Sequence, residues 1–257
     1  MTLDVWLVAR LAAELHDALS GARIVDVAAG DSGFRIMLHR RRVTTILRLT
    51  SGGRGPLLAL RAAADAQNEK AGAGWAGGVA PLLRGCTVES VQAVPGDRIV
   101  FVDVVSRSAF GVPARHRIAY ELEPNKSNVL VLRPSGEERW QILAAAKEIQ
   151  GAEGSRSIDV GEPYEPPPPR RSRLDRAAFD AMVRDCPDPS AKTLARLLGD
   201  RDPMCSPPLA RDVVESALEA SGEGPLSQRL LDAWDSLERR VARAAADIAA
   251  QVYAWGS

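Results

Sequence analysis

Apolar positions in the first twenty residues follow a helical period. Leucines recur at four-residue intervals from Leu7 to Leu19, with Val8 and Ala12 beside them, and this spacing predicts an amphipathic helix. The Ser20-Gly21 pair that follows is typical of a helix end. The pattern therefore predicts one helix near the N-terminus that ends before residue 22.

Beyond this helix the pattern changes to short, β-branched runs separated by turns rich in Gly, Pro, Asn, Asp and Ser. Eight runs are predicted as strands: 22–29, 34–39, 43–49, 56–60, 87–94, 98–105, 116–122 and 128–133. Short strands with this punctuation favour a β-sandwich or a partly open barrel over βαβ units. The Ala- and Gly-rich residues 62–85 interrupt them and predict a loop that leads into a short helix covering an edge of the sheet.

A change in composition marks a domain boundary between Val160 and Arg176, where four consecutive prolines precede a basic run. We predict a β domain over 1–165, a Pro/Arg-rich linker over 166–175, a helical domain over 176–222 and the start of a coiled coil over 223–257. Ser190 and Ser206 are the expected N-caps of two short helices. Apolar residues from Leu226 to Val252, with Trp234 among them, are predicted on one helix face, and from Leu237 to Ile248 their four-three-four spacing is the a/d rhythm of a coiled coil.

Charge and cysteine content exclude several classes of protein. Lys plus Arg and Asp plus Glu both total 33, so no net field attracts the chain to nucleic acid or membrane, although a local patch could still do so. The scattered positions of Cys86, Cys186, Cys205 and of His16, His39 and His116 predict neither disulfides nor a metal site. Charges interrupt the N-terminal apolar run, and no run is long enough to span a bilayer. We expect a cytoplasmic protein without a cofactor.

The sequence contains no strong catalytic motif: GxGxxG, Walker, GxSxG and HExxH patterns are all absent. Two basic clusters are candidate phosphate contacts, and solvated surface segments are the alternative interpretation of both. The first is Arg40, Arg41 and Arg42 in the turn after His39; the second is Arg170, Arg171, Arg173 and Arg176 after the prolines. The adjacent Asp97 and Arg98 at a strand entry are explained on sequence grounds alone by an exposed salt bridge.

Seven stretches occur in a fixed order along almost the whole chain: LSGARIVDV, VAPLLRGCTVESV, PGDRIVFVDVV, YELEPNKSNVLVL, ILAAAKEI, VGEPYEPPPP and SPPLARDVV. Together they resemble the N-terminal part of NFACT proteins, the RqcH-type ribosome quality-control factors that are often catalogued as fibronectin-binding protein A homologues. The resemblance implies an α+β protein. A β-sandwich like the N-terminal domain of formamidopyrimidine-DNA glycosylases would precede a helix–two-turns–helix domain and a coiled-coil arm.

The resemblance also implies a tRNA-binding site. The family's Asp-Arg motif matches Asp97 and Arg98, and a second motif matches Glu121, Leu122 and Glu123, where the family has an apolar residue at the third position. Lys126, Ser127 and Asn128 keep the polarity of the family's next segment but not its sequence. A guanidinium held by a carboxylate could stack on a base or bind phosphate bidentately.

The function implied by the resemblance is non-enzymatic. NFACT proteins bind the large ribosomal subunit carrying a stalled peptidyl-tRNA and recruit tRNA, mainly alanyl-tRNA in bacteria, for C-terminal tailing without mRNA. No membrane or small-molecule partner is implied. The glycosylases use an N-terminal proline amine and an adjacent glutamate, whereas this chain reads Met1-Thr2-Leu3, so we expect no base excision. A diverged glycosylase-like lyase and an extracellular adhesin remain alternatives.

Overall fold

The computed structural model divides the chain into two compact units, residues 1–3 with 7–167 and residues 4–6 with 168–257. This division falls inside the Pro/Arg-rich segment that composition indicates as a boundary. The residues described are 5–30, 33–51, 56–63, 74–107, 112–123, 126–137, 139–151, 156–168, 174–186, 190–202, 205, 207–219, 228–229, 234–235 and 238–239.

The predicted N-terminal helix is present as α1 (Val5–Leu19). Its buried positions include Val8, Ala12, Leu15 and Leu19, with alternating spacings of four and three, whereas Leu7 and Leu11 are only half-buried. The predicted amphipathic helix is confirmed, and its buried face combines Leu15 and Leu19 with Val8 and Ala12, because a row at i+4 drifts around a helix of 3.6 residues per turn. The helix ends as predicted at Gly21, whose φ of 77° is in the left-handed region.

Nine antiparallel strands form one continuous sheet in the first unit, so the α+β class is confirmed. The strands are β1 (Arg23–Gly30), β2 (Gly33–Arg40), β3 (Val43–Thr50), β4 (Leu57–Ala62), β5 (Thr87–Ala93), β6 (Ile99–Arg107), β7 (Pro113–Glu121), β8 (Asn128–Pro134) and β9 (Trp140–Ala145). Their order is β4-β3-β2-β1-β5-β6-β7-β8-β9. The prediction missed β9, since its alanines lower the β-propensity of an otherwise apolar run.

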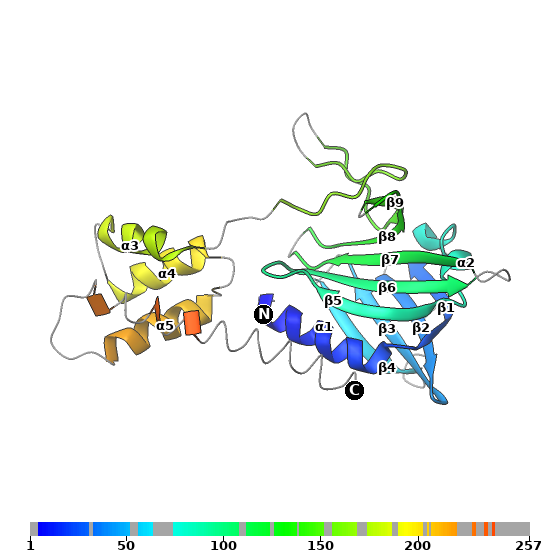
Figure 1. The fold of residues 1–257 in the computed structure, drawn as a ribbon, viewed down its shortest axis with the longest axis horizontal. Coiled ribbons are helices and arrows are strands. Elements are labelled where there is room, and N and C mark those ends of the chain that lie inside the picture. The colour runs from blue at the N-terminus through cyan, green and yellow to red at the C-terminus, as the bar shows by residue number, and fades with distance from the viewer. Residues whose placement is uncertain are drawn as a thin grey trace. The chain divides into compact units, whose positions relative to one another are not determined.

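The sheet curves so that its two halves face each other across one core (Figure 1). Phe34 and Leu47 from one half share this core with Tyr120 and Val131 from the other. The Tyr120 hydroxyl donates to the carbonyl oxygens of Thr50 at 2.6 Å and of Leu57 at 3.1 Å, which ties β7 to the β3–β4 connection. The expected sandwich is thus built from one coiled sheet in the described residues, not from two separate sheets.

The segment after β4 fills the space between the two halves. The described part forms η2 (Gly74–Ala76) and α2 (Ala80–Leu83), and η2 contacts both the central strand β1 and the edge strand β9. Trp75 packs on Phe34 with ring centroids 5.0 Å apart, and Leu83 is fully buried. The predicted helix, α2, therefore packs into the core beside β1, while the contact with the edge strand β9 is made by η2.

The second unit contains α3 (Arg176–Arg184), α4 (Ala191–Arg201) and α5 (Pro207–Glu219). Ser190 caps α4 as predicted, since its hydroxyl accepts from the Thr193 amide at 3.3 Å. Phe179 and Trp234 stack at 4.4 Å in the centre of this unit. Ser206 and most of 223–257 lie outside the described residues, so the coiled-coil prediction stays untested. None of the helices described is both long and apolar enough to span a membrane.

Candidate nucleic-acid interface

The Asp97–Arg98 pair lies in the tight turn between β5 and β6. Gly96 has a φ of 75°, the Asp97 amide donates to the Val94 carbonyl at 3.1 Å, and the Asp97 carboxylate accepts from the backbone amide of Arg98 at 2.6 Å. Among the residues that the structure describes, no ion pair joins the two side chains, so the strand-end salt bridge is not found. Both side chains are half-buried, and the guanidinium of Arg98 has no hydrogen-bonding partner in the described part of the chain.

A buried ion pair lies beside this turn. Arg156 donates to both oxygens of the Glu121 carboxylate, at 3.0 and 2.5 Å, and the Tyr164 hydroxyl donates to the same carboxylate at 3.1 Å. The side chains of Glu121 and Arg156 are 4% and 17% exposed. Because these partners occupy the carboxylate, Glu121 could contact RNA directly only by breaking the pair. In this structure Glu121 holds the side chains of Arg156 and Tyr164 in place.

Electrostatics connect the turn to the ion pair. Burial raises the pKa of Tyr164 well above its ordinary value; the Glu121 carboxylate adds to this shift, Arg156 opposes it, and the charge of Asp97 raises the pKa further. A neutral phenol can donate to Glu121, which is the bond observed. The Asp97 carboxylate therefore lies close enough to raise the pKa of Tyr164, whose hydroxyl donates to Glu121.

The segment that follows Glu121 is anchored to both neighbouring loops. The Leu122 amide donates to the Arg98 carbonyl at 2.8 Å, and the Asn128 side chain binds the backbone of Lys147 at 2.8 and 3.0 Å. Leu122, Ser127 and Asn128 are at most 1% exposed. Of the predicted site, only Asp97, Arg98, Glu123 and Lys126 have side-chain surface to offer; the others position them. We refer to these four residues as the Asp97–Lys126 corner.

The sequence analysis did not identify Arg117, an arginine on the outer surface of the sheet. Arg117 binds both oxygens of Asp103, at 2.6 and 2.9 Å, and its guanidinium lies between the rings of Phe101 and Trp140 at 4.4 and 4.3 Å. Cation–π contacts on both faces restrict this guanidinium to one orientation. The signal was present in the alternation of β6 and β7, where Asp103 and Arg117 occupy directly paired positions.

The arginines that were predicted as phosphate contacts differ from one another in their surroundings. Arg40 donates to the carbonyl oxygens of Asp17 at 2.6 Å and Ala18 at 3.1 Å, which satisfies the last turn of α1 and complements its dipole. Arg41 and Arg42 are exposed, with φ values of 48° and 69° in a two-residue hairpin turn. Arg170, Arg171 and Arg173 lie outside the described residues. In the β2–β3 turn, Arg41 and Arg42 are therefore the arginines that are exposed to solvent.

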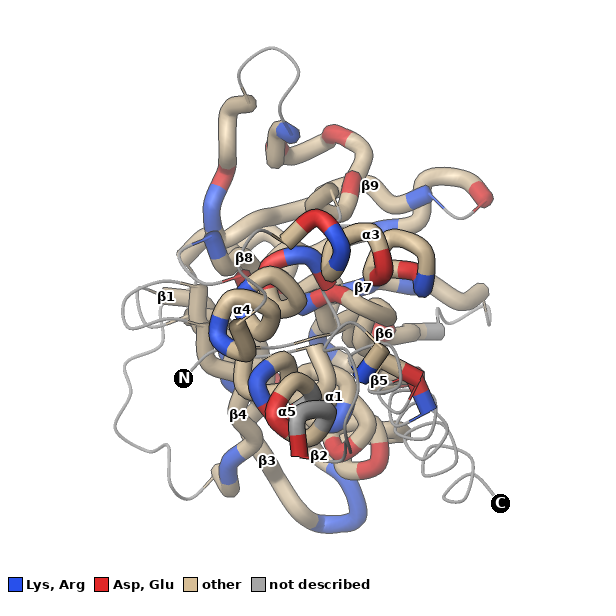
Figure 2. Tube along the Cα trace, turned by 90° about the vertical axis from the view of Figure 1, so that its left-hand side faces the viewer, with Lys and Arg blue, Asp and Glu red and all other residues tan. Residues whose placement is uncertain are grey.

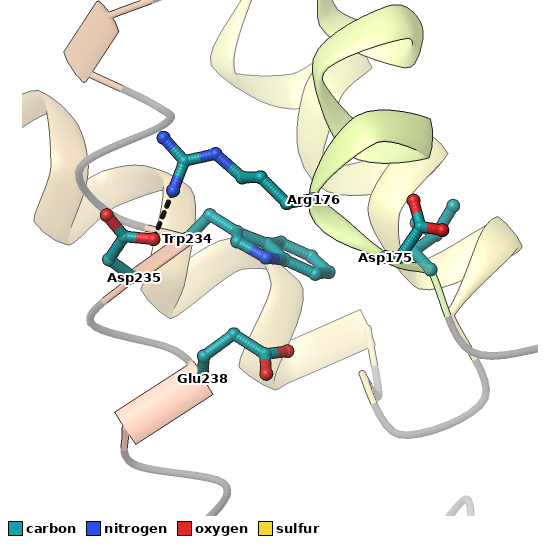
Figure 3. A pocket seen from close by; sticks show the side chains of 6 residues that line it. Asp175, Arg176, Trp234, Asp235 and Glu238 are labelled. Carbon is teal, nitrogen blue, oxygen red and sulfur yellow. Dashed lines mark hydrogen bonds and ion pairs between the residues drawn. The ribbon is translucent and has the colours of Figure 1, made fainter.

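Arg176 is engaged within the second unit (Figure 3). It pairs with Asp235 beside an open pocket of about 460 Å³ lined by Leu174, Asp175, Arg176, Trp234, Asp235 and Glu238. The Asp175 carboxylate accepts from the Ala178 amide at 2.7 Å and caps α3. Three carboxylates around one guanidinium make this pocket unfavourable for a phosphate.

The raised pKa of Tyr164 predicts a loss of stability in alkali. Because its folded-state pKa lies above the value of about 10 expected when unfolded, the stabilisation it gives is complete below pH 10 and is lost as pH rises. Tyr164→Phe should reduce the slope of unfolding free energy against pH above that point by up to about 1.4 kcal/mol per pH unit. Urea unfolding at several alkaline pH values measures this slope, and an unchanged slope would contradict the assignment.

Comparison with known proteins identifies the fold. The sequence matches the profile of the NFACT N-terminal and middle domains over residues 4–254. Three similar solved structures are each 18% identical in sequence. The N-terminal domain of fibronectin-binding protein PavA from Streptococcus pneumoniae matches with a TM-score of 0.67 over 85% of this chain and 84% of that chain. The N-terminal part of a fibronectin/fibrinogen-binding protein from Streptococcus suis has a TM-score of 0.65 over 91% and 85% of the two chains, and the fibrinogen-binding protein from Staphylococcus aureus has one of 0.64 over 93% and 82%. No curated protein matches the sequence significantly. Because the family profile covers nearly the whole chain, the protein belongs to the NFACT family through its N-terminal and middle domains.

Proposed function

We propose that this chain is an RNA-binding module of ribosome-associated quality control. It recruits tRNA, with alanyl-tRNA the expected species, to large ribosomal subunits that carry a stalled peptidyl-tRNA, for C-terminal tailing without mRNA. Membership of the NFACT family supports the class of partner. The proposal places the tRNA contact at the Asp97–Lys126 corner and assigns the chain no catalytic step of its own.

The observation that carries the proposal is the placement of Arg98. Its backbone is fixed by the Asp97 carboxylate at 2.6 Å and by the Leu122 amide at 2.8 Å, while its guanidinium has no hydrogen-bonding partner in the described residues. A half-buried guanidinium that has no partner and extends from a fixed backbone is available to bind a planar base or a phosphate. Lys126 is exposed in the segment that follows Leu122 and would add a second positive charge to the site.

Copurification of RNA tests the proposal. The tagged protein, isolated from cells at low salt, should carry tRNA, and Asp97→Ala combined with Arg98→Ala should reduce the bound tRNA about tenfold or more. Sequencing the bound RNA identifies the tRNA species. Arg139→Ala is the matched control, since Arg139 is an exposed arginine in the turn between β8 and β9, and it should leave the bound tRNA unchanged.

Equal tRNA recovery with the double variant would contradict the proposed site, and no tRNA with the wild type would contradict the function. Cleavage of a DNA duplex containing an abasic site would instead favour a glycosylase-like lyase. The similar solved structures are described as fibronectin- or fibrinogen-binding proteins. Saturable binding of fibronectin by the purified chain, together with its presence on the cell surface, would favour an adhesin.

A further inference from the structure

The residues before the proline run fold back onto the edge of the sheet. We call residues 156–165 the strap. The Tyr164 amide donates to the carbonyl of Trp140 in β9, the edge strand, at 2.7 Å. Ile158 is 1% exposed and packs in the apolar cluster of β7, β8 and β9. The strap therefore belongs to the first unit and has a fixed place on it.

Two side chains of the strap reach the end of β7. Arg156 binds both oxygens of the Glu121 carboxylate, and its Nε donates to the carbonyl of Glu165 at 2.6 Å, so one guanidinium joins Glu121 to the end of the strap. The Tyr164 hydroxyl donates to Glu121 at 3.1 Å, and its ring packs edge-on against Phe101 with the centroids 6.3 Å apart. Glu121 is thus held by two donors that both come from the strap.

The connection continues from Glu121 to Arg98 through the backbone. Glu121 is paired with Ile99 in the β6–β7 ladder, and the next amide, that of Leu122, donates to the Arg98 carbonyl at 2.8 Å. Ile99 and Leu122 are at most 1% exposed. The Arg98 backbone is therefore held from two sides, by the Asp97 carboxylate and by the residues at the end of β7.

The charges of the strap do not favour direct contact with RNA. It contains one arginine and three acidic residues, Asp159, Glu162 and Glu165, and Figure 2 shows acidic positions in red along the trace next to β9. Arg156, the single cation, is 17% exposed and already binds a carboxylate. Acidic side chains repel phosphate, so any effect of the strap on RNA binding is indirect.

Loss of either donor would leave the Glu121 carboxylate incompletely satisfied. This group is 4% exposed, and a buried carboxylate is tolerated only while charged partners and hydrogen-bond donors compensate it. Without them it must move toward water, and the end of β7 moves with it. Because the Leu122 amide comes next in the chain, its bond to the Arg98 carbonyl would weaken. The turn would then present the guanidinium in more orientations, which lowers affinity for a planar or bidentate partner.

We propose that Arg156 and Tyr164 are positioning residues for Arg98: through Glu121 and Leu122, the strap sets the position of the turn that presents the guanidinium to tRNA. The proposal rests on the proposed function for its RNA partner and adds to it by making the strap part of the tRNA site. Neither residue touches RNA, so each acts only through Arg98.

Amide hydrogen exchange in the free protein, followed by NMR, tests the positioning without RNA. Tyr164→Phe removes the hydroxyl and keeps the ring, and Arg156→Lys keeps the charge but cannot bind both oxygens. Each should speed exchange of the Leu122 amide about two- to tenfold relative to the amides of β2 and β3, the range expected for one lost hydrogen bond. Ile36→Val, in the core at 1% exposure, is the control and should leave this ratio unchanged. Acceleration of all these amides alike would show a merely structural role and overturn the proposal.

A double-mutant cycle in tRNA affinity tests whether the strap acts through Arg98. Tyr164→Phe should weaken tRNA binding about two- to tenfold in the wild-type background and less than about twofold in Arg98→Ala, because residues that act through a shared partner are not additive. Ile36→Val should leave the affinity within about twofold. Equal effects of Tyr164→Phe in both backgrounds would overturn the proposal.

The two measurements distinguish failure of this proposal from failure of the proposed function. A wild-type protein that binds no tRNA would contradict the function alone. Selective exchange at Leu122 would then still support a strap that positions the Arg98 turn, and uniform exchange would overturn it. Unfolding midpoints of all variants show whether the fold is retained, and Tyr164→Phe keeps the test valid if Arg156→Lys unfolds.

Discussion

Replacing Arg156 by methionine is expected to lower the unfolding free energy of the first unit by about 3–5 kcal/mol. The substitution leaves the Glu121 carboxylate, 4% exposed, without the two donors at 3.0 and 2.5 Å that now satisfy it. Methionine has a similar length and fills the same space, so the loss reports the unpaired charge and not a cavity. Urea unfolding followed by circular dichroism measures the change.

A double-mutant cycle separates the ion pair from packing. Glu121→Gln keeps an acceptor for the Tyr164 hydroxyl, which now donates to Glu121 at 3.1 Å. Combined with Arg156→Met, it should recover most of the stability, because replacing both charged partners is far less costly than removing one. Arg133→Met, at an exposed arginine that binds Gln141 at 2.7 Å, should cost less than about 1 kcal/mol. Equal losses for Arg156→Met alone and for the double variant would contradict a coupled pair.

The Glu121–Arg156–Tyr164 group also shows what sequence patterns can and cannot locate. The predicted strand 116–122 contains Glu121, and the resemblance to the family marks this residue as functional, yet its partners lie 35 and 43 positions further along the chain. Nothing local to Arg156 signals that it returns to the end of β7. Long-range pairing depends on how the segment after β9 packs, and periodicity carries no information about that.

The strands were predictable where β-branched residues alternate, and less so where small residues replace them. Trp140–Ala145 was missed as a strand because alanine fits helices as well as sheets. The arginines of β2–β4 are a contrasting example. Their charges are visible in the sequence, but only the pairing of Arg35 with Arg48 shows that they share a face.

Arg98→Lys is expected to reduce tRNA affinity about 10- to 30-fold although it keeps the charge. The Arg98 backbone is fixed at the Asp97 carboxylate and the Leu122 amide, so the proposed contact depends on a planar guanidinium delivered from a rigid turn. Lysine is a point charge with rotatable donors and can neither bind bidentately nor stack on a base, and a lost bidentate contact is worth about 1–3 kcal/mol.

The salt dependence of binding distinguishes this geometric role from simple charge attraction. Arg98→Lys should keep the wild-type slope of log affinity against log salt, because the number of neutralised phosphates is unchanged, whereas Arg98→Ala should lower the slope by about 0.7–0.9 if the contact is to phosphate. An unchanged slope in both variants would indicate stacking on a base instead. Lysine binding tRNA as tightly as arginine would show that only charge matters at this position, and the turn that holds Arg98 would then need another explanation.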